Sequence, residues 1–569
     1  MKKTIATLLL VNSFFTLNAQ KLETKIPNTA DVVITGNAEN VFKLIKFSDI
    51  DSSAIGKEVL KKINRRREDK INSVENIGID LKSNMYYFFK NTDSVSYHNI
   101  LLPLNNRKQY ESTLKEYQLE DVQTENGYSY ILGSREISVW NDQMLLVVNA
   151  NKSNNYFDEH KERFEQLKQE EESNYAFKKR IVKSWIKQEA LNILNGNYSN
   201  TVSTNKKFQE SKKKNSSATL WIPNYGELMS NIISSYGNNL LPVSYLTLEG
   251  GKNIYGIEQV AANVFFEKGS ASILLDMEVS SGMKKAFKKI YNKKINNKLV
   301  NSFNHDKALA FWSVSMSVKE ALIQYPELVN QMYGGLIPSV KEEIDIVGSL
   351  LSIILDEEAI GKLITGDALF VLNDFVEKEV SYKTYEYDED YNRKEVTKTK
   401  KTVVPDFTLM IGSEERKIWE KILKIGQKHK LILINNNVYE FAVKKELPFD
   451  IYVVVKDEVL YLTSSKTNAV NLGAGRTNFT STKHSKLIKK NASVVYADVN
   501  KIINKIPKNY VSKSEGKMIN FSNANLKDAY LRVSKVCGST ISTEVKLNTQ
   551  GKEENTLKLL LSLINEVAK

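Results

Sequence analysis

The chain has 569 residues, which is too long for one hydrophobic core and predicts several domain-sized units. Hydrophobic residues make up 41% of it and charged residues 26%, a balance that excludes disorder over the whole length. The formal charge of +13 comes from lysines scattered among acids, so it indicates a basic surface but does not by itself identify a nucleic-acid-binding protein.

The first residues have the pattern of an export signal. Lys2 and Lys3 give a positive start, residues 5–17 are largely apolar, and Ala19 supplies a small residue at the cleavage position. We therefore predict that residues 1–19 are a signal peptide cleaved after Ala19. No later apolar run reaches the roughly 18 residues that span a bilayer. We expect a protein of the periplasm or one associated with the outer membrane.

Four stretches of the chain repeat one pattern, beginning at Ala30, Ala218, Ala308 and Ala492. Each alanine precedes a short apolar run, a polar turn, and apolar residues spaced three and four apart. The run predicts a central strand, and the spacing predicts a helix that packs back on the sheet. The step from the first stretch to the third nearly equals that from the second to the fourth. This predicts a tandem duplication of a half-chain of roughly 270 residues.

Other segments recur in the same order. "VSYHNILLPLNNRKQYESTL" from Val95 corresponds to "PDFTLMIGSEERKIWEKIL" from Pro405, each a strand followed by an amphipathic helix. "VWNDQMLLVV" from Val139 corresponds to "VVKDEVLYLT" from Val454, each a hairpin around an Asp-centred turn. We predict an α+β fold: two tandem copies of a mostly antiparallel sheet module with helices packed on one face. The copies are residues 20–300 and 301–569.

A charged helical insertion, residues 151–217, distinguishes the first copy. Within it Phe177, Ile181 and Trp185 lie four residues apart and share one helix face. Two interpretations stay open. The face docks a partner or a membrane surface, or it packs on its own domain.

Two further features lie in the second copy. Residues 380–403 alternate around an acidic centre, which predicts a long hairpin projecting from the sheet. Cys537 is the only cysteine, so an intrachain disulfide is excluded. Its flanking residues indicate a strand, and we expect a buried, inert thiol.

A search for catalytic patterns finds none. The zinc-protease helix, the hydrolase serine elbow and the phosphate loop are all absent from the sequence. The five histidines are isolated along the chain: His98, His160, His305, His429 and His484. The sequence therefore indicates no catalytic residue, no cofactor and no metal site.

The opening "KIPNTADVVITGNAENVFKLI" and the later "LITGDALFVLNDF" carry a resemblance to a known family. With its Ile-Pro-x-x-Ala strand opening, the chain resembles exported Bacteroidetes proteins that are catalogued only as a domain of unknown function. The resemblance implies the envelope of a two-membrane bacterium and supplies no catalytic residue. Many members look like lipoproteins, and this chain lacks the anchoring cysteine.

Taken together, these features predict an exported envelope protein that binds or scaffolds without catalysis. The expected partner is an envelope protein or a glycan, with contact to a membrane surface as a further option and nucleic acid not expected; the oligomeric state stays open. One alternative is a carrier of a lipid or other apolar ligand between sheet and helices, which requires a dry apolar cavity. Another is an unrecognised hydrolase, which requires carboxylates or a Ser–His pair in one cleft.

Overall fold

The computed structural model divides into two compact units. It describes residues 22–65, 67–114, 116–196, 198–229, 256–333, 346, 350, 355–387, 389, 391–435, 437–442, 449–479, 483–506 and 513–568. The first unit comprises Met1–Leu228, Glu258–Leu275 and Gly551–Lys569, and the second comprises Met229–Ile257 and Asp276–Gln550. The predicted signal peptide, residues 1–19, lies outside the described residues. Within the described residues, no helix is both long enough and apolar enough to cross a bilayer.

An antiparallel sheet forms the centre of the first unit. β1 pairs with β2 on one side and with β8 on the other. β3, β7, β6, β5 and β4 follow beyond β2, and β9 follows beyond β8. The strands are β1 (Val32–Gly36), β2 (Met85–Asn91), β3 (Val95–Pro103), β4 (Gln123–Glu125), β5 (Tyr128–Leu132), β6 (Glu136–Trp140), β7 (Met144–Lys152), β8 (Ala218–Ile222) and β9 (Ile257–Phe266). β10 (Ser270–Val279) crosses the boundary between the units at Leu275.

Helices cover both faces of this sheet. The largest cluster of buried side chains includes Val148 of β7 and Ile186 of α10. Leu145 of β7 faces the other way and packs with Trp140 and with Tyr110 of α6. The helices are α3 (Ala38–Phe42), α4 (Phe47–Ser52), α5 (Ala54–Ile63), η1 (Val74–Ile77), α6 (Arg107–Thr113), α7 (Glu116–Glu120), α8 (Asn154–Glu159), α9 (Lys161–Glu165), α10 (Asn174–Asn195), η2 (Val202–Thr204), α11 (Lys206–Ser211) and α23 (Thr556–Val567).

Antiparallel strands also form the centre of the second unit. β11 pairs with β12 and β18, β13, β17, β16, β15 and β14 follow beyond β12, and β19 and β20 follow beyond β18. The strands are β11 (Ala310–Ser315), β12 (Asp367–Tyr387), β13 (Arg393–Gly412), β14 (Ile432–Asn435), β15 (Val438–Phe441), β16 (Tyr452–Lys456), β17 (Val459–Thr463), β18 (Asn491–Ala497), β19 (Leu526–Ser534) and β20 (Thr540–Thr549). When β11 is aligned with β1, the order of the strands is the same in the two units.

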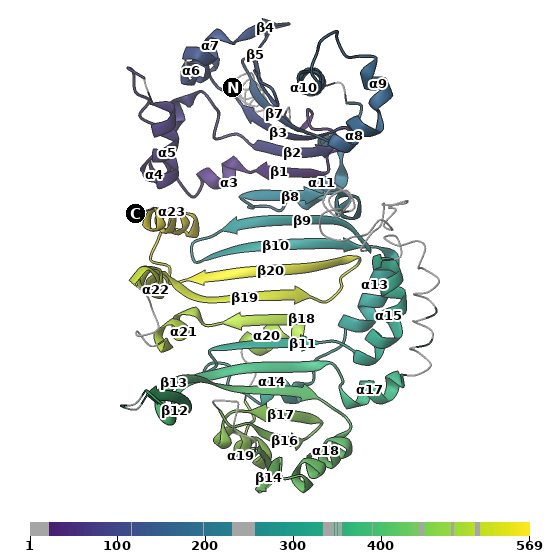
Figure 1. Ribbon diagram of the computed structural model, residues 1–569, viewed down its shortest axis with the longest axis vertical. Coiled ribbons are helices and arrows are strands. Elements are labelled where there is room, and N and C mark those ends of the chain that lie inside the picture. The colour runs from purple at the N-terminus through teal and green to yellow at the C-terminus, as the bar shows by residue number, and fades with distance from the viewer. Residues whose placement is uncertain are drawn as a thin grey trace, which may run out of the picture. The chain divides into compact units, whose positions relative to one another are not determined.

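The helices of the second unit also occupy both faces of their sheet. Leu472 of α19 and Ile488 of α20 belong to the main core, whereas Leu423 of α18 packs on the opposite face with Val453 and Leu460. α13, α15 and α17 gather at one end of the strands (Figure 1). The helices are α13 (Ser281–Tyr291), α14 (Asn297–Asn301), α15 (Val318–Tyr333), α17 (Glu357–Leu363), α18 (Arg416–Lys428), α19 (Lys466–Ala474), α20 (Lys483–Lys490), α21 (Val499–Lys505) and α22 (Lys513–Asn525).

The structure confirms the α+β class and the antiparallel sheet, but helices on one face only were a wrong expectation. The apolar runs in β7 and β16 are continuous rather than alternating, so both faces of these strands need cover. β12 and β13 pair as far as Tyr387 and Arg393, which forms the long hairpin expected over residues 380–403. Packing also places α13 in the second unit and α23 in the first, whereas the sequence repeat puts them in residues 20–300 and 301–569, respectively.

Candidate functional site: a basic cavity in the second unit

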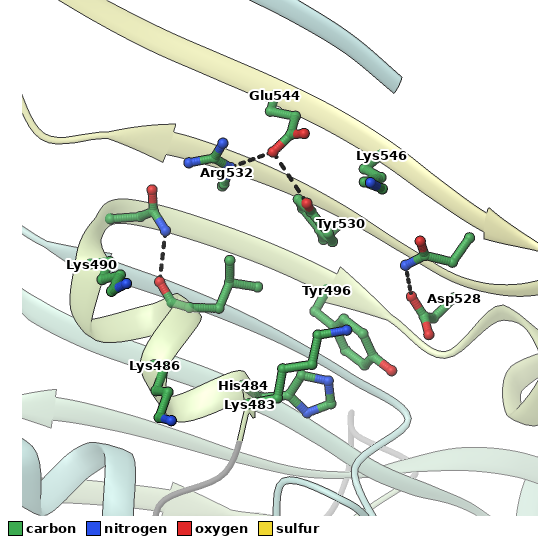
Figure 2. A pocket seen from close by; sticks show the side chains of 13 residues that line it. Lys483, His484, Lys486, Lys490, Tyr496, Asp528, Tyr530, Arg532, Glu544 and Lys546 are labelled. Carbon is green, nitrogen blue, oxygen red and sulfur yellow. Dashed lines mark hydrogen bonds and ion pairs between the residues drawn. The ribbon is translucent and has the colours of Figure 1, made fainter. Parts of the chain in front are cut away.

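α20 supplies one wall of a cavity of about 540 Å³ in the second unit. Ser485 and Ile488 are buried on the inner side of the helix. Lys483, Lys486 and Lys490 are spaced three and four apart, so they share the opposite face and line the cavity. Among the described residues, no ion pair or hydrogen bond engages the side chains of these three lysines. Figure 2 shows them along the turns of α20.

The other wall consists of alternate residues of β19 and β20, which point to the same face of the sheet. The ladder sets Arg532 opposite Glu544, Tyr530 opposite Lys546, and Asp528 opposite Asn548. All six side chains line the cavity. The sheet thus contributes three polar cross-strand pairs at a position where a core would place apolar ones.

The two carboxylates of the lining already have partners. Arg532 donates to Glu544, Tyr530 donates to the same carboxylate at 3.1 Å, and Asn548 donates to Asp528 (Figure 2). Burial and Glu544 raise the pKa of Tyr530 to about 12, so it stays a neutral phenol at neutral pH. The lining holds five cationic side chains against these two carboxylates, which leaves the cavity positively charged.

Two aromatic side chains, His484 and Tyr496, also line the cavity. His484 lies 4.3 Å from the ring of Tyr496, which stacks on Phe311 at 5.0 Å. Burial lowers the pKa of His484, which favours the neutral imidazole. The positive charge of the cavity therefore comes from the lysines and Arg532 rather than from this imidazole.

A second cavity of about 450 Å³ lies in the same unit, between β12, β13, α19 and the segment that precedes β11. Two carboxylates line it, Asp374 on β12 and Asp406 on β13, and they are opposite each other in the ladder. Lys505 forms an ion pair with Asp374 at 3.0 Å. Burial raises the pKa of Asp406. Among the described residues, no group of three or more His, Cys, Asp or Glu side chains could hold a metal ion.

The structure places Phe177, Ile181 and Trp185 against the core of the first unit. Phe177 is 4% exposed, and Ile181 and Trp185 are partly buried against the same cluster. The ring of Trp185 lies 5.4 Å from that of Phe157 in α8. The interpretation in which this face packs on its own domain thus accounts for all three side chains, and docking of a partner here stays a prediction.

The expectation of a buried Cys537 was wrong. Cys537 is exposed, because it lies in the turn between β19 and β20 and not inside a strand. The histidines are isolated along the chain as stated, and the fold brings His305 and His484 together, with their rings 6.5 Å apart. The basic cavity itself was missed, although the spacing of the three lysines on a short helix was a readable signal.

Comparison with known proteins gives little further information. No protein-family model matches the chain, and no curated protein matches it. Crystal forms I, IV and III of TP0453 match with 10% identity, covering 49%, 45% and 48% of this chain and 82%, 79% and 87% of theirs. Their TM-scores of 0.22, 0.25 and 0.25 are too low to carry an argument about fold or function.

Proposed function

We propose that this protein is a non-catalytic binding protein of the cell envelope and that its basic cavity takes an anionic ligand. The observation that carries the proposal is the set of three lysines on α20 that line the cavity and have no anionic partner among the described residues. Lysines held this way attract phosphate or carboxylate groups. A cavity of about 540 Å³ also lies within the usual range for ligand sites, roughly 300–1,000 Å³.

The envelope location predicted from the sequence narrows the ligand to acidic glycans and phosphate-bearing headgroups. Both present a negative charge on a polar, hydrogen-bonding body. The lining contains one aliphatic side chain, Leu487, which argues against a carrier that encloses an apolar tail. The hydrolase alternative keeps one supporting observation, the facing carboxylates Asp374 and Asp406 of the second cavity.

We also propose that residues 20–300 and 301–569 arose by tandem duplication. The shared strand order supports this, and so does the register at the centre of each sheet. Val33 pairs with Trp221 in the first unit, and Phe311 pairs with Tyr496 in the second. Trp221 and Tyr496 are therefore counterparts, whereas matching the alanines of the two stretches pairs Trp221 with Val495. A slip of one residue exchanges the faces of a strand, so register is the better guide.

In the first unit, the rung that corresponds to Arg532 carries a different side chain. Thr219 pairs with Asn263 in the first unit, on the rung where Val494 pairs with Arg532 in the second. Asn263 is fully buried; it accepts from Thr219 and donates to the carbonyl of Ser211 at the end of α11, both at 3.0 Å. The first unit thus fills the position from which Arg532 faces the cavity. This difference supports the second unit as the binding unit.

Replacing Lys483, Lys486 and Lys490 together by Gln tests the proposal. Titration of the purified chain with oligogalacturonate and with glycerol 3-phosphate separates an acidic glycan from a headgroup. We expect binding of at least one probe, weakened tenfold or more in the triple variant, because each charge-assisted contact contributes about 1.5 kcal/mol or more. Added salt weakens binding by the wild type as well.

The matched control replaces Lys417, Lys421 and Lys424 by Gln. These lysines are exposed on α18 at the same kind of spacing, so the change in net charge is identical. Affinity should stay at the wild-type level in this control. Equal losses in both triple variants would show attraction by the overall charge alone, and absence of binding to both probes would contradict the proposal.

A further inference from the structure

The second cavity differs from the basic cavity in its charge. Lys307 and Arg476 line it together with Asp374 and Asp406, so the cationic and anionic side chains balance. Apart from these charges the lining is rich in amides, and Phe479 provides aromatic surface. A balanced, amide-rich cavity of about 450 Å³ favours a neutral polar ligand over an ion.

A β-bulge builds one side of this cavity. Leu372 pairs with Phe407 and Asp374 with Asp406, which leaves Asn373 as the extra residue of β12. Its amide donates to Asp406 and to Thr408, both at 3.3 Å. Bulges recur beside functional sites because the extra residue re-aims neighbouring side chains. Here the bulge brings Asn373 into the lining next to the paired aspartates.

The lining offers both donors and acceptors to a ligand. Asn468 donates to Asp406 at 3.5 Å, and no described residue donates to the side-chain oxygens of Asn373 or Asn468. The side chains of Asn471 and Arg476 bond no described residue and supply donors. Each hydroxyl of a sugar is at once a donor and an acceptor, so it needs neighbours of both kinds. The apolar faces of a sugar ring suit Phe479, which is partly exposed.

The counterpart of this cavity in the first unit is filled. In the first unit, Lys90 of β2 pairs with Tyr97 of β3. This pair corresponds to Asp374 and Asp406 of the second unit. Lys90 forms an ion pair with Glu189 of α10 at 3.0 Å, and Tyr198 donates to the same carboxylate at 2.9 Å. The helical insertion of the first unit thus fills the space that corresponds to the second cavity of the second unit.

We propose that the second cavity binds a neutral polyhydroxylated ligand, a saccharide. The proposal goes beyond the anionic ligand of the basic cavity and does not depend on it. Phe303 of the second cavity lies 4.0 Å from the ring of His305, which lies 6.5 Å from the ring of His484 of the basic cavity. A few buried rings therefore separate the two sites.

Titration of the full chain with cellotriose, maltotriose and chitotriose tests the proposal. We expect at least one of the three to bind with a Kd of about 1 mM or tighter. The double variant Asn471→Ala with Arg476→Ala should weaken that binding at least about tenfold, since each lost hydrogen bond to a ligand removes a specific contact. Its melting temperature should stay unchanged, because neither side chain bonds a described residue. Asp374→Asn is the second variant, and it keeps the shape of the site.

Variants of the two cavities separate the two proposals. The triple lysine variant of α20 should bind the trisaccharide like the wild type, and the Asn471/Arg476 variant should bind the anionic probe like the wild type. Absence of binding to all three trisaccharides overturns the saccharide proposal. Trisaccharide binding that survives in the Asn471/Arg476 and Asp374 variants, or that is lost in the lysine variant, also overturns it.

Discussion

His484 of α20 lies close to His305, although the two residues are far apart in the sequence. The Nε2 atom of His305 donates to the carbonyl of Val300 at 2.8 Å, and its buried Nδ1 has no hydrogen-bond partner. This arrangement suits a neutral imidazole. Burial lowers the pKa of both histidines below the ordinary value of 6.5, with Asp306 and Lys489 as the nearby charges for His305. Neutral histidines here leave charge recognition to the lysines of α20.

We expect the second unit to lose stability as the pH falls below about 6.5. The unfolded chain binds protons first because the folded-state pKa values are lower, so protonation favours unfolding, and the stability is full above the unfolded-state pKa. Amide exchange in β11 and β18, normalised for intrinsic rates at pH 7.5 and 5.5, measures the effect. His305→Phe should reduce the pH dependence, and an unchanged pH dependence in that variant would contradict the assignment.

At the scale of elements, α10 favours one of the two interpretations of residues 151–217, packing on its own domain. Its 22 residues bury a stripe that includes Phe177 and Ile186, and the helix packs on β6 and β7. A helix that served only to dock a partner would not need to bury this stripe against its own domain. The insertion thus serves as cover for the first sheet.

Phe177→Ala should lower the free energy of unfolding of the first unit by about 3–5 kcal/mol, the usual cost of removing a buried phenylalanine. Urea unfolding followed by amide exchange in β6 and β7, on which α10 packs, measures the loss. Ser184→Ala on the exposed side of α10 is the control and should change stability by less than about 0.5 kcal/mol. A stable Phe177→Ala protein that loses an envelope partner would favour the docking interpretation instead.

The sequence pattern predicts the helices and strands better than it predicts which helix packs on which face of the sheet. The hairpins around Asn141 and Asp457 form as expected, because a polar turn between apolar runs is a local signal. Which face stays open is not local. It depends on α20 meeting strands that come about 40 residues later in the chain, so the basic cavity could not be located. The one-residue mismatch of Trp221 has the same origin, since pairing partners and not spacing define register.

At the scale of the whole molecule, the closing helices of the two proposed copies are exchanged. α13 follows the last strand of the first copy but belongs to the second unit, where Ser317 donates from its backbone to Ile290. α23 follows the last strand of the second copy but belongs to the first unit, where Asn555 donates to the carbonyl of Leu44 at 2.7 Å. Each unit therefore needs a helix from the other part of the chain, so neither half of the sequence is a complete folding unit.

Truncation after Gln550, which removes α23, should therefore open the first unit and spare the second. The side-chain oxygen of Asn565 accepts from the backbone of Ala54 at the start of α5 at 2.6 Å, and Lys558 forms an ion pair with Asp49 at 3.4 Å. We expect faster amide exchange in α4 and α5, with α18 unchanged. Asn565→Ala removes one of these bonds and should cost about 1 kcal/mol, a smaller effect in the same place. Opening of β19 and β20 while α4 and α5 stay protected would assign α23 to the second unit and refute the exchange.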